Sequence, residues 1–350
     1  MTVERDALVR AVELAYRGPR AGGNPRVGCV IVDQTGILGE GFHQGAGTPH
    51  AEAAALAAVP ESARHRLTGA TAVVTLEPCH HTGRTGPCTL ALAEAGISRV
   101  IYAVPDPNPT AAGGSAWLQA QGIETLTASA AGLGEDVVAA AKQVSHSWLT
   151  AVVRGTPWFI GKTAATLDGR VAAADGTSQW ITGEAARAHA HKIRADVDAI
   201  VVGTGTVLVD NPALTARHPD GTPAATQPLR VAVGLRDVPA DAAIRNGPGT
   251  WQHLRTHDLT VVAATLAELG ARHVLLEGGP TLFTAALRAG LIDELHAYVA
   301  PVFLGGGRSA VGDLGITTIS AANRWHTESV ERLGDDVLFV ARKETECSPD

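Results

Sequence analysis

The stretch NPRVGCVIVDQTGILGEGFHQGAGTPHAEAAALAA, residues 24–58, indicates how the first part of the chain folds. Its segment 27–32 is a continuous apolar run rich in β-branched residues, which is typical of a strand buried on both faces. A polar turn follows at 33–36, and the segment 37–44 is predicted as a return strand. The residues after Pro49 are strong helix formers, and a preceding proline favours a helix start.

The same alternation continues through the first part of the chain. Further predicted strands lie at 70–79, 98–106 and 122–128, and predicted helices lie near 8–15 and at 88–96, 114–122 and 131–150. This order predicts a mixed α/β sandwich built on one sheet.

A second α/β unit is predicted after a short linker at 154–157, which places the domains at 1–150 and 155–345. The predicted strands of the second unit are 157–164, 198–204, 229–235, 259–264, 273–279, 294–303 and 336–343, and its predicted helices are 183–195 and 280–289. The segment 218–228 has the composition of a loop, and 236–257 shows no clear pattern.

The composition excludes several classes of protein. The 350 residues are 45% hydrophobic and 18% charged, so the chain can bury a core. A net charge of −7 argues against a nucleic-acid or membrane-surface binder, which needs a basic face. No apolar run approaches the ~20 residues that span a bilayer. The four cysteines are too few for a disulfide scaffold, and the charged N-terminus is unlike a signal peptide, so we expect a cytoplasmic protein.

His50, Cys79 and Cys88 form a candidate zinc site in the first half. One imidazole and two thiolates give three protein ligands, and a catalytic zinc keeps its fourth position for water. Zinc lowers the pKa of such a water to about 7. Glu52 lies in the same first helical turn as His50, where it can transfer the proton of that water. This H-x-E and P-C pattern is typical of zinc deaminases.

Two other interpretations of these residues stay open. His80 or His81 could supply a fourth protein ligand, which would make the site structural rather than catalytic. The two cysteines could instead be small buried apolar residues, as Cys29 is expected to be in its strand.

The motifs NPRVGCVIV, GFHQGAGTPHAEAAAL, TLEPCHHTGRTGPCTLAL and DPNP together resemble the deaminase domain of the bifunctional riboflavin-biosynthesis deaminase/reductases. The long segment between the two cysteines is typical of that family. The resemblance implies a cytidine-deaminase-like fold, zinc bound by His50, Cys79 and Cys88, and Glu52 as the proton shuttle. It also implies that Asn24 and His43 contact the pyrimidine and ribose, and that Arg84 contacts the substrate phosphate.

The alternatives for two of these residues are structural. Asn24 precedes a proline and could be a turn residue, and Arg84 could be a solvated loop charge.

The second half contains no G-x-G-x-x-G, and the GTGT at 203–206 is too short for a Rossmann fingerprint. The segment LLEGGPTL at 275–282 predicts a strand, a turn and a helix whose first N–H groups could hold a phosphate. A plain strand–helix connection with proline at the helix start is the alternative. Lys162, one of only four lysines, lies in an apolar strand, where it needs a partner or an edge position.

The motifs KTAATLDGR (162–170), GTSQWITG (176–183), IRADVDAIVVGTGTVLVDNPALTAR (193–217) and LLEGGPTL resemble the reductase domain of the same family, whose fold is similar to dihydrofolate reductase. The resemblance implies NADPH contacts at Ala164, Trp180, Thr206, Asp210, Gly279, Pro280 and Thr281. It implies substrate contacts at Lys162, Ser178, Arg194, Leu214, Arg217 and Glu277. The sequence GLR at 234–236 departs from the turn that is more usual in the family.

The function expected from this resemblance has two steps. Zinc-dependent hydrolytic deamination of 2,5-diamino-6-ribosylamino-4(3H)-pyrimidinone 5′-phosphate is followed by NADPH-dependent reduction of the ribosyl chain to ribityl. We expect this small phosphorylated pyrimidine as the partner, no nucleic acid or membrane partner, and a homo-oligomer, a dimer or tetramer. One alternative makes the second domain a non-catalytic dimerisation or substrate-binding module. Another is a deaminase acting on bases of nucleic acid.

Overall fold

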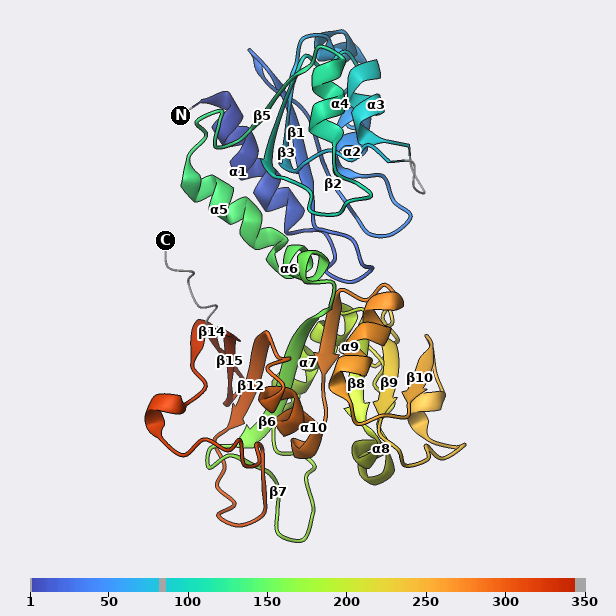
Figure 1. The fold of residues 1–350 in the computed structure, drawn as a ribbon, viewed down its shortest axis with the longest axis vertical. Helices are drawn as coiled ribbons and strands as arrows, with labels where there is room; N and C mark the ends of the chain where they lie inside the picture. The colour runs from blue at the N-terminus through green and yellow to red at the C-terminus, as the bar shows by residue number, and fades with distance from the viewer. Residues whose placement is uncertain (1, 82–85, 344–350) are drawn as a thin grey trace. The chain divides into compact units, whose positions relative to one another are not determined.

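The structure is a computed structural model that describes residues 2–81 and 86–343. The chain forms two compact units, Met1–Arg154 and Gly155–Asp350 (Figure 1). Within the described residues, every helix is too short or too polar to cross a lipid bilayer.

The first unit is built on one sheet. Its described residues form five strands, which are β1 (Gly28–Asp33), β2 (Gly36–Phe42), β3 (Thr71–Leu76), β4 (Arg99–Val104) and β5 (Glu124–Thr127). The strands follow the order β2-β1-β3-β4-β5, with β1 antiparallel to β2 and β3, and with β3, β4 and β5 parallel. The helices are α1 (Val3–Ala15), α2 (Ala51–Ala57), α3 (Cys88–Glu94), α4 (Gly114–Ala120), α5 (Glu135–Val144) and α6 (His146–Arg154), with a 3-10 helix at Glu61–Leu67.

Helices cover both faces of this sheet (Figure 1). Successive residues of a strand point to opposite faces. Val30 and Val32 therefore pack against α1 and α5, while Cys29 and Ile31 pack against α2, α3 and α4. All four of these β1 side chains are buried, which explains why the strand is apolar without alternation.

Helix α2 lies very close to β2 because residue 41 is a glycine. A Cβ at Gly41 would lie 2.3 Å from the backbone N of Ala55 and 2.5 Å from the carbonyl of Ala51. Any side chain there would push the helix away. The missing side chain at Gly41 thus sets the position of the helix that begins with His50 and Glu52.

The second unit contains a larger sheet. Its described strands are β6 (Trp158–Thr166), β7 (Arg170–Ala172), β8 (Ala199–Gly203), β9 (Leu229–Val233), β10 (Trp251–Leu254), β11 (His273–Leu276), β12 (Glu294–Ala300), β13 (Arg308–Ser309), β14 (Trp325–Leu333) and β15 (Asp336–Lys343). The main sheet has the order β10-β9-β8-β11-β6-β12-β15-β14, and β13 pairs with β7. The helices are α7 (Glu184–Ala195), α8 (Thr204–Asp210), α9 (Leu259–Glu268) and α10 (Pro280–Arg288), with 3-10 helices at Ala243–Arg245 and Ile319–Ala321.

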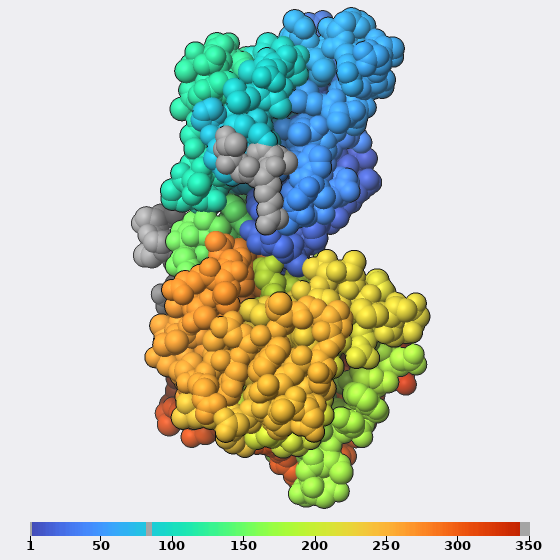
Figure 2. Space-filling view, turned by 90° about the vertical axis from the view of Figure 1, so that its right-hand side faces the viewer, coloured from blue at the N-terminus to red at the C-terminus, as the bar shows by residue number. Residues whose placement is uncertain are grey.

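The strands from β10 to β12 run parallel, so their carboxyl ends meet at one edge of the sheet. Helices α9 and α10 pack on one face through Leu266 and Phe283, and they form much of the orange surface in Figure 2. The other face packs against Ile193 of α7 and Val207 of α8. The edge at the carboxyl ends is therefore where loops of the second unit can form a site.

The strand predicted at 259–264 is wrong, because this segment is the start of helix α9. Its β-branched residues suggested a strand, but Leu259, Val262, Ala263 and Leu266 are buried at helical spacing. The side chain of Asp258 also caps the helix by accepting from the backbone N–H of Thr260. Tertiary packing and this cap outweigh the strand preference of the valines.

Other segments were left unplaced by the sequence. The weakly patterned range 236–257 contains β10 and a 3-10 helix, and helix α8 begins within the GTGT sequence, at Thr204. Strand β14 was also missed, because its side chains are mostly exposed and polar, which leaves no apolar alternation to detect.

Candidate active sites

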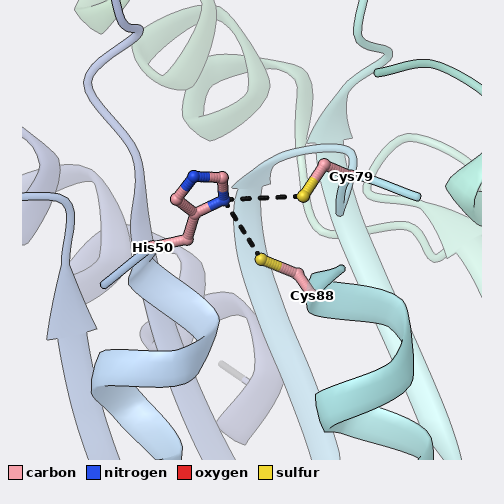
Figure 3. Close-up of side chains that lie close together, drawn as sticks. All are labelled: His50, Cys79 and Cys88. Atoms are coloured by element: carbon pink, nitrogen blue, oxygen red, sulfur yellow. Dashed lines mark hydrogen bonds between the residues drawn. The ribbon is translucent and has the colours of Figure 1, made fainter. Parts of the chain in front are cut away.

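The three predicted zinc ligands come together at the carboxyl end of β3 (Figure 3). His50 is the residue just before α2, Cys79 follows β3, and Cys88 begins α3. Their ligand atoms lie within 4.8 Å of one another, and His50 Nδ1 lies 3.5 Å from the sulfur of Cys79 and 3.3 Å from that of Cys88. Two helix starts and one strand end thus bring one nitrogen and two sulfurs to a single point.

The charges of this group fit a divalent cation. The Cys88 thiol donates to Cys79, which lowers the pKa of Cys79 to about 4, and His50 adds to this effect. The same contact and burial raise the pKa of Cys88 far above its ordinary value. One proton is therefore shared between two buried sulfurs, and a zinc ion would compensate the charge of both as thiolates.

Glu52 lies beside this group at the second position of α2. Its side chain is only 4% exposed, and burial, followed by the negative charge of Cys79, raises the pKa of the carboxyl to about 6. A hydrogen bond with Cys88 links the carboxyl to the sulfur pair. A carboxyl with this pKa can both accept and release a proton near neutral pH.

His43 and Asn24 adjoin the metal group on the side of His50. The rings of His43 and His50 meet edge to face with their centres 5.4 Å apart. His43 Nδ1 lies 3.2 Å from the carbonyl of Pro49, which can only accept, so this nitrogen carries the proton. His43 Nε2 then accepts from the Asn24 amide at 3.1 Å. Burial lowers the pKa of His43, which favours this neutral form.

The two histidines considered as a fourth ligand stand outside the described metal group. The ring of His80 is engaged elsewhere, since its Nδ1 lies 2.8 Å from the hydroxyl of Thr89 and the ring stacks on Trp117. Among residues 2–81 and 86–343, the group that could hold a metal consists of His50, Cys79 and Cys88. Arg84 lies outside the described residues.

In the second unit, Glu277 follows β11 and is the centre of a charge cluster. Its carboxylate is 9% exposed and lies 3.3 Å from Lys162 Nζ and 2.8 Å from Arg194 Nη2. Burial opposes ionisation, but the charges of Arg194 and Lys162 outweigh it, so the pKa of Glu277 lies below its usual value. Lys162 also lies over the ring of buried Tyr298, 5.7 Å from its centre. Lys162, which the sequence places in an apolar strand, therefore does have a partner.

Three hollows of the second unit share lining residues around this cluster. Cavity A, of about 560 Å³, is lined among others by Lys162, Ser178, Trp180, Arg194, Arg217 and Glu277. Cavity B, of about 210 Å³, shares Lys162, Ala164, Ser178, Asp210 and Glu277 with cavity A and adds Thr206, Gly279 and Pro280. Cavity C, of about 660 Å³, shares Thr206 and Gly279 with cavity B and adds Thr281. The shared residues place the three cavities in a row, A beside B and B beside C, and we refer to this row as the path.

The hydroxyl of Thr206 accepts from the backbone N–H of Gly279 at 3.1 Å, which joins the starts of α8 and α10 at the junction of cavities B and C. The donors and small residues at this junction suit the phosphates of a dinucleotide. The path is therefore suited to an extended ligand such as NADPH.

Leu214 is the predicted reductase residue that the structure places away from these cavities. Its side chain is 3% exposed and packs in the core with Val207, and its φ is +54°. Any substrate contact of Leu214 would therefore use its backbone. Arg217 lines cavity A and is exposed, whereas Arg194 already binds Glu277, so Arg217 has the freer guanidinium for an anionic substrate group.

The sequence analysis missed Tyr298, Arg236 and Arg308 as lining residues. Tyr298 lies in a predicted strand, where its alternation indicated only burial. Arg308 begins the two-residue strand β13 directly after three glycines, a stretch with no periodic pattern, and Arg236 belongs to the GLR sequence that departs from the usual turn. The signal available for Arg236 was its position directly after the predicted strand 229–235, where a charged side chain can face a ligand.

Comparison with known proteins covers both units. Residues 1–104 match the family model of the cytidine and deoxycytidylate deaminase zinc-binding region, and residues 157–339 match that of the RibD C-terminal domain. The riboflavin biosynthesis protein RibD of Mycobacterium tuberculosis (strain ATCC 25618 / H37Rv) is 48% identical over 91% of this chain and 91% of that protein. The chain belongs to the RibD family.

Other RibD proteins agree with this assignment. RibD of Escherichia coli (strain K12) is 37% identical over 95% of this chain and 97% of that protein. The structure of Acinetobacter baumannii RibD, form 1, superposes with a TM-score of 0.87 at 37% identity over 98% of this chain and 99% of that one. A Thermotoga maritima deaminase/reductase structure has a TM-score of 0.79 at 31% identity, covering 98% and 99%.

The RibD matches confirm the resemblance seen in the sequence and the α/β fold class predicted for both halves. They also support an enzyme with a zinc-binding deaminase domain and an NADPH-dependent reductase domain. A second unit without catalytic function is not favoured, because the RibD C-terminal model spans most of it.

Proposed function

We propose that the first unit deaminates 2,5-diamino-6-ribosylamino-4(3H)-pyrimidinone 5′-phosphate and that the second reduces the ribosyl chain of the product with NADPH. The deaminase would occupy residues 1–150 and the reductase residues 155–345. The observation that carries this proposal is the convergence of His50, Cys79 and Cys88 beside the buried Glu52. That group lies on a chain that also carries a RibD C-terminal domain.

In the deamination, water adds to C2 of the pyrimidinone and the 2-amino group leaves as ammonia. His50, Cys79 and Cys88 would hold a zinc ion, which would supply a Lewis acid that lowers the pKa of water at the site. Glu52 takes a proton from the attacking water and delivers it to the leaving amine. Asn24 donates one amide hydrogen to His43 and keeps its carbonyl oxygen and second hydrogen for the pyrimidine.

In the reduction, the ring-opened ribosylamine carries a C1′=N bond that gains a hydride at C1′ and a proton at nitrogen. NADPH supplies the hydride when it is bound. A charge cluster of Glu277, Lys162 and Arg194 lines cavity A, and its Lys162 and Glu277 also line cavity B. In this proposal the substrate binds beside that cluster. We assign the proton donor to neither Lys162 nor Glu277.

The remaining contacts form two groups in this proposal. Substrate binds through Asn24, His43, Arg84, Lys162, Ser178, Arg194, Leu214, Arg217 and Glu277. NADPH binds through Ala164, Trp180, Thr206, Asp210, Gly279, Pro280 and Thr281. The proposal includes a cytoplasmic homo-oligomer, a dimer or tetramer, which cell fractionation and light scattering of the purified protein would test.

The test measures ammonia release and NADPH oxidation by the purified protein together with its zinc content. We expect Cys88→Ala to lose the metal and the ammonia release while NADPH oxidation on the deaminated substrate continues. Cys29→Ala is the matched control, because Cys29 is also a buried thiol of the first unit but lies outside the metal group. Full ammonia release by a metal-free Cys88→Ala protein would refute the proposed deaminase site.

A further inference from the structure

Cavity C has an unusual charge for a protein with a net charge of −7. Its lining includes Arg236, His257 and Arg308 and contains no aspartate or glutamate. Cavity A, by contrast, is lined by acidic and basic side chains together, among them Glu277 and Arg194. The charged side chains that line cavity C are therefore all basic, which suits an anionic group of a ligand.

Arg236 is the cation of cavity C without a counter-charge. Within residues 2–81 and 86–343 it forms neither a hydrogen bond nor an ion pair, and its side chain is exposed. The next residue, Asp237, does not neutralise it, because Asp237 pairs with Arg255 at 2.6 Å. A guanidinium without a protein partner can form two parallel hydrogen bonds with a phosphate.

The position of Arg236 in the sheet relates it to the dinucleotide path. Strands β9, β8 and β11 are parallel neighbours, and the segments after them carry Arg236, Gly205 and Gly279. In dinucleotide-binding sheets, the phosphates lie at a helix start after one strand, and the adenosine ribose lies near the end of another strand to one side of it. Strand β8 lies between β9 and β11, so Arg236 lies two strands to one side of Gly279. Gly279 would then mark the pyrophosphate and Arg236 the adenosine ribose.

Gly205 leaves room for this guanidinium. A Cβ at Gly205 would lie 2.7 Å from Nη2 of Arg236. The arginine therefore lies over the backbone at the start of α8, on the wall of cavity C. Leu235, which is 55% exposed and lines the same cavity, offers an apolar surface for a base beside the charge.

We propose, building on the reductase function above, that Arg236 binds the 2′-phosphate of NADPH and makes the enzyme prefer NADPH to NADH. Arg236 lines cavity C but not cavity B, so it lies at the far end of the path from Glu277. Arg308 lines both cavities and belongs to the part of the path that NADPH and NADH share. The two arginines therefore have separate roles.

The test is calorimetric titration of the full-length protein with NADPH, NADH and 2′,5′-ADP, which carries the 2′-phosphate but no nicotinamide. We expect Arg236→Ala to weaken NADPH and 2′,5′-ADP by about 10- to 100-fold and to leave NADH nearly unchanged. Arg236→Lys should retain part of the preference, and Gly205→Ala should reduce it by displacing the guanidinium. Arg332→Ala is the matched control, since Arg332 is an exposed arginine of the same unit that does not line cavity C.

The outcomes separate this inference from the function on which it rests. Equal loss of NADPH and NADH in Arg236→Ala, or unchanged NADPH affinity, would overturn the role of Arg236 while leaving the reductase intact. Arg308→Ala should weaken both dinucleotides alike. A wild-type protein that binds neither dinucleotide would overturn the proposed reductase function and this inference with it.

Discussion

The two candidate sites neutralise buried negative charge in opposite ways. In the part of the chain that the structure describes, no lysine or arginine hydrogen-bonds to the sulfur of Cys79 or Cys88, so that site needs an added cation. Glu277 in the second unit has its cations built in, because Lys162 and Arg194 both contact its carboxylate. Each solution removes the cost of burying an unpaired charge.

This difference shows which perturbation each site is sensitive to. The first site depends on metal supply and on the position of the helix that carries His50 and Glu52. The second depends on the ion pairs of Glu277 with Lys162 and Arg194. These pairs are lost when Glu277 is replaced by a neutral residue or is protonated at low pH. The predictions below separate these dependences.

The largest effect is expected from Glu52→Gln. Gln fills the same space but cannot accept the proton of the attacking water, so ammonia release should fall by about 10²- to 10⁴-fold. Zinc content, and NADPH oxidation on the deaminated substrate, should stay at wild-type level. Glu61→Gln, an exposed glutamate of the same unit, should leave both steps unchanged. Wild-type ammonia release by Glu52→Gln would eliminate Glu52 as the proton shuttle.

The next effect concerns the position of α2. A Cβ in Gly41→Ala would lie 2.3 Å from the backbone of α2, so the variant should lose about 1–3 kcal/mol of stability through overpacking. It should also bind less zinc, because His50 moves with the helix. Gly306→Ala has open space around its Cβ and serves as the control. The measurements are thermal unfolding and zinc stoichiometry. Full zinc binding by Gly41→Ala would show that the position of α2 does not control the metal site.

Glu277→Gln tests the charge cluster of the second unit. Removing the carboxylate leaves Lys162 and Arg194 without their partner, so unfolding free energy should fall by about 1–3 kcal/mol at neutral pH. Zinc binding by the first unit should not change. Denaturant unfolding at neutral pH measures the loss, and a variant as stable as the wild type would show that the cluster does not stabilise the fold.

The pH dependence of this difference follows from the lowered pKa of Glu277. A carboxyl whose pKa is lower in the folded protein than in the unfolded chain stabilises the fold above its unfolded value, near 4.5. That stabilisation is lost as the pH falls through the folded pKa. The stability gap between wild type and Glu277→Gln should therefore be constant near neutrality and narrow below about pH 4.5. A stability difference that grows as the pH falls would contradict a lowered pKa of Glu277 in the folded protein.

The smallest effect is expected at the cap of α9. Asp258→Ala removes the acceptor for the Thr260 N–H and should cost about 1 kcal/mol, measured as a small decrease in melting temperature. Asp258→Asn should retain most of the stability, because an amide oxygen can also accept. Equal losses in both variants would mean that charge rather than capping matters at this position.

The elements predicted most reliably from the sequence were those with strong periodicity and clear boundaries, such as β1 and the helix after Pro49. The prediction for 259–264 failed because a run of valines suits a strand and a buried helix equally, and local preference cannot show which face is covered. Strand β14 gave no signal, since most of its residues are polar and exposed and no apolar alternation marks it as a strand.

The sequence by itself determined the chemical groups available to this protein: one imidazole and two thiols at helix and strand ends, a carboxylate two residues from the imidazole, and a lysine within an apolar strand. Only the tertiary structure decided that three of these groups lie within 4.8 Å of one another, that Glu277 pairs with both Lys162 and Arg194, and that Arg236 has no counter-charge in cavity C. The physical reason is that local patterns specify strands and helices, whereas distances between residues far apart in the chain depend on how those elements pack.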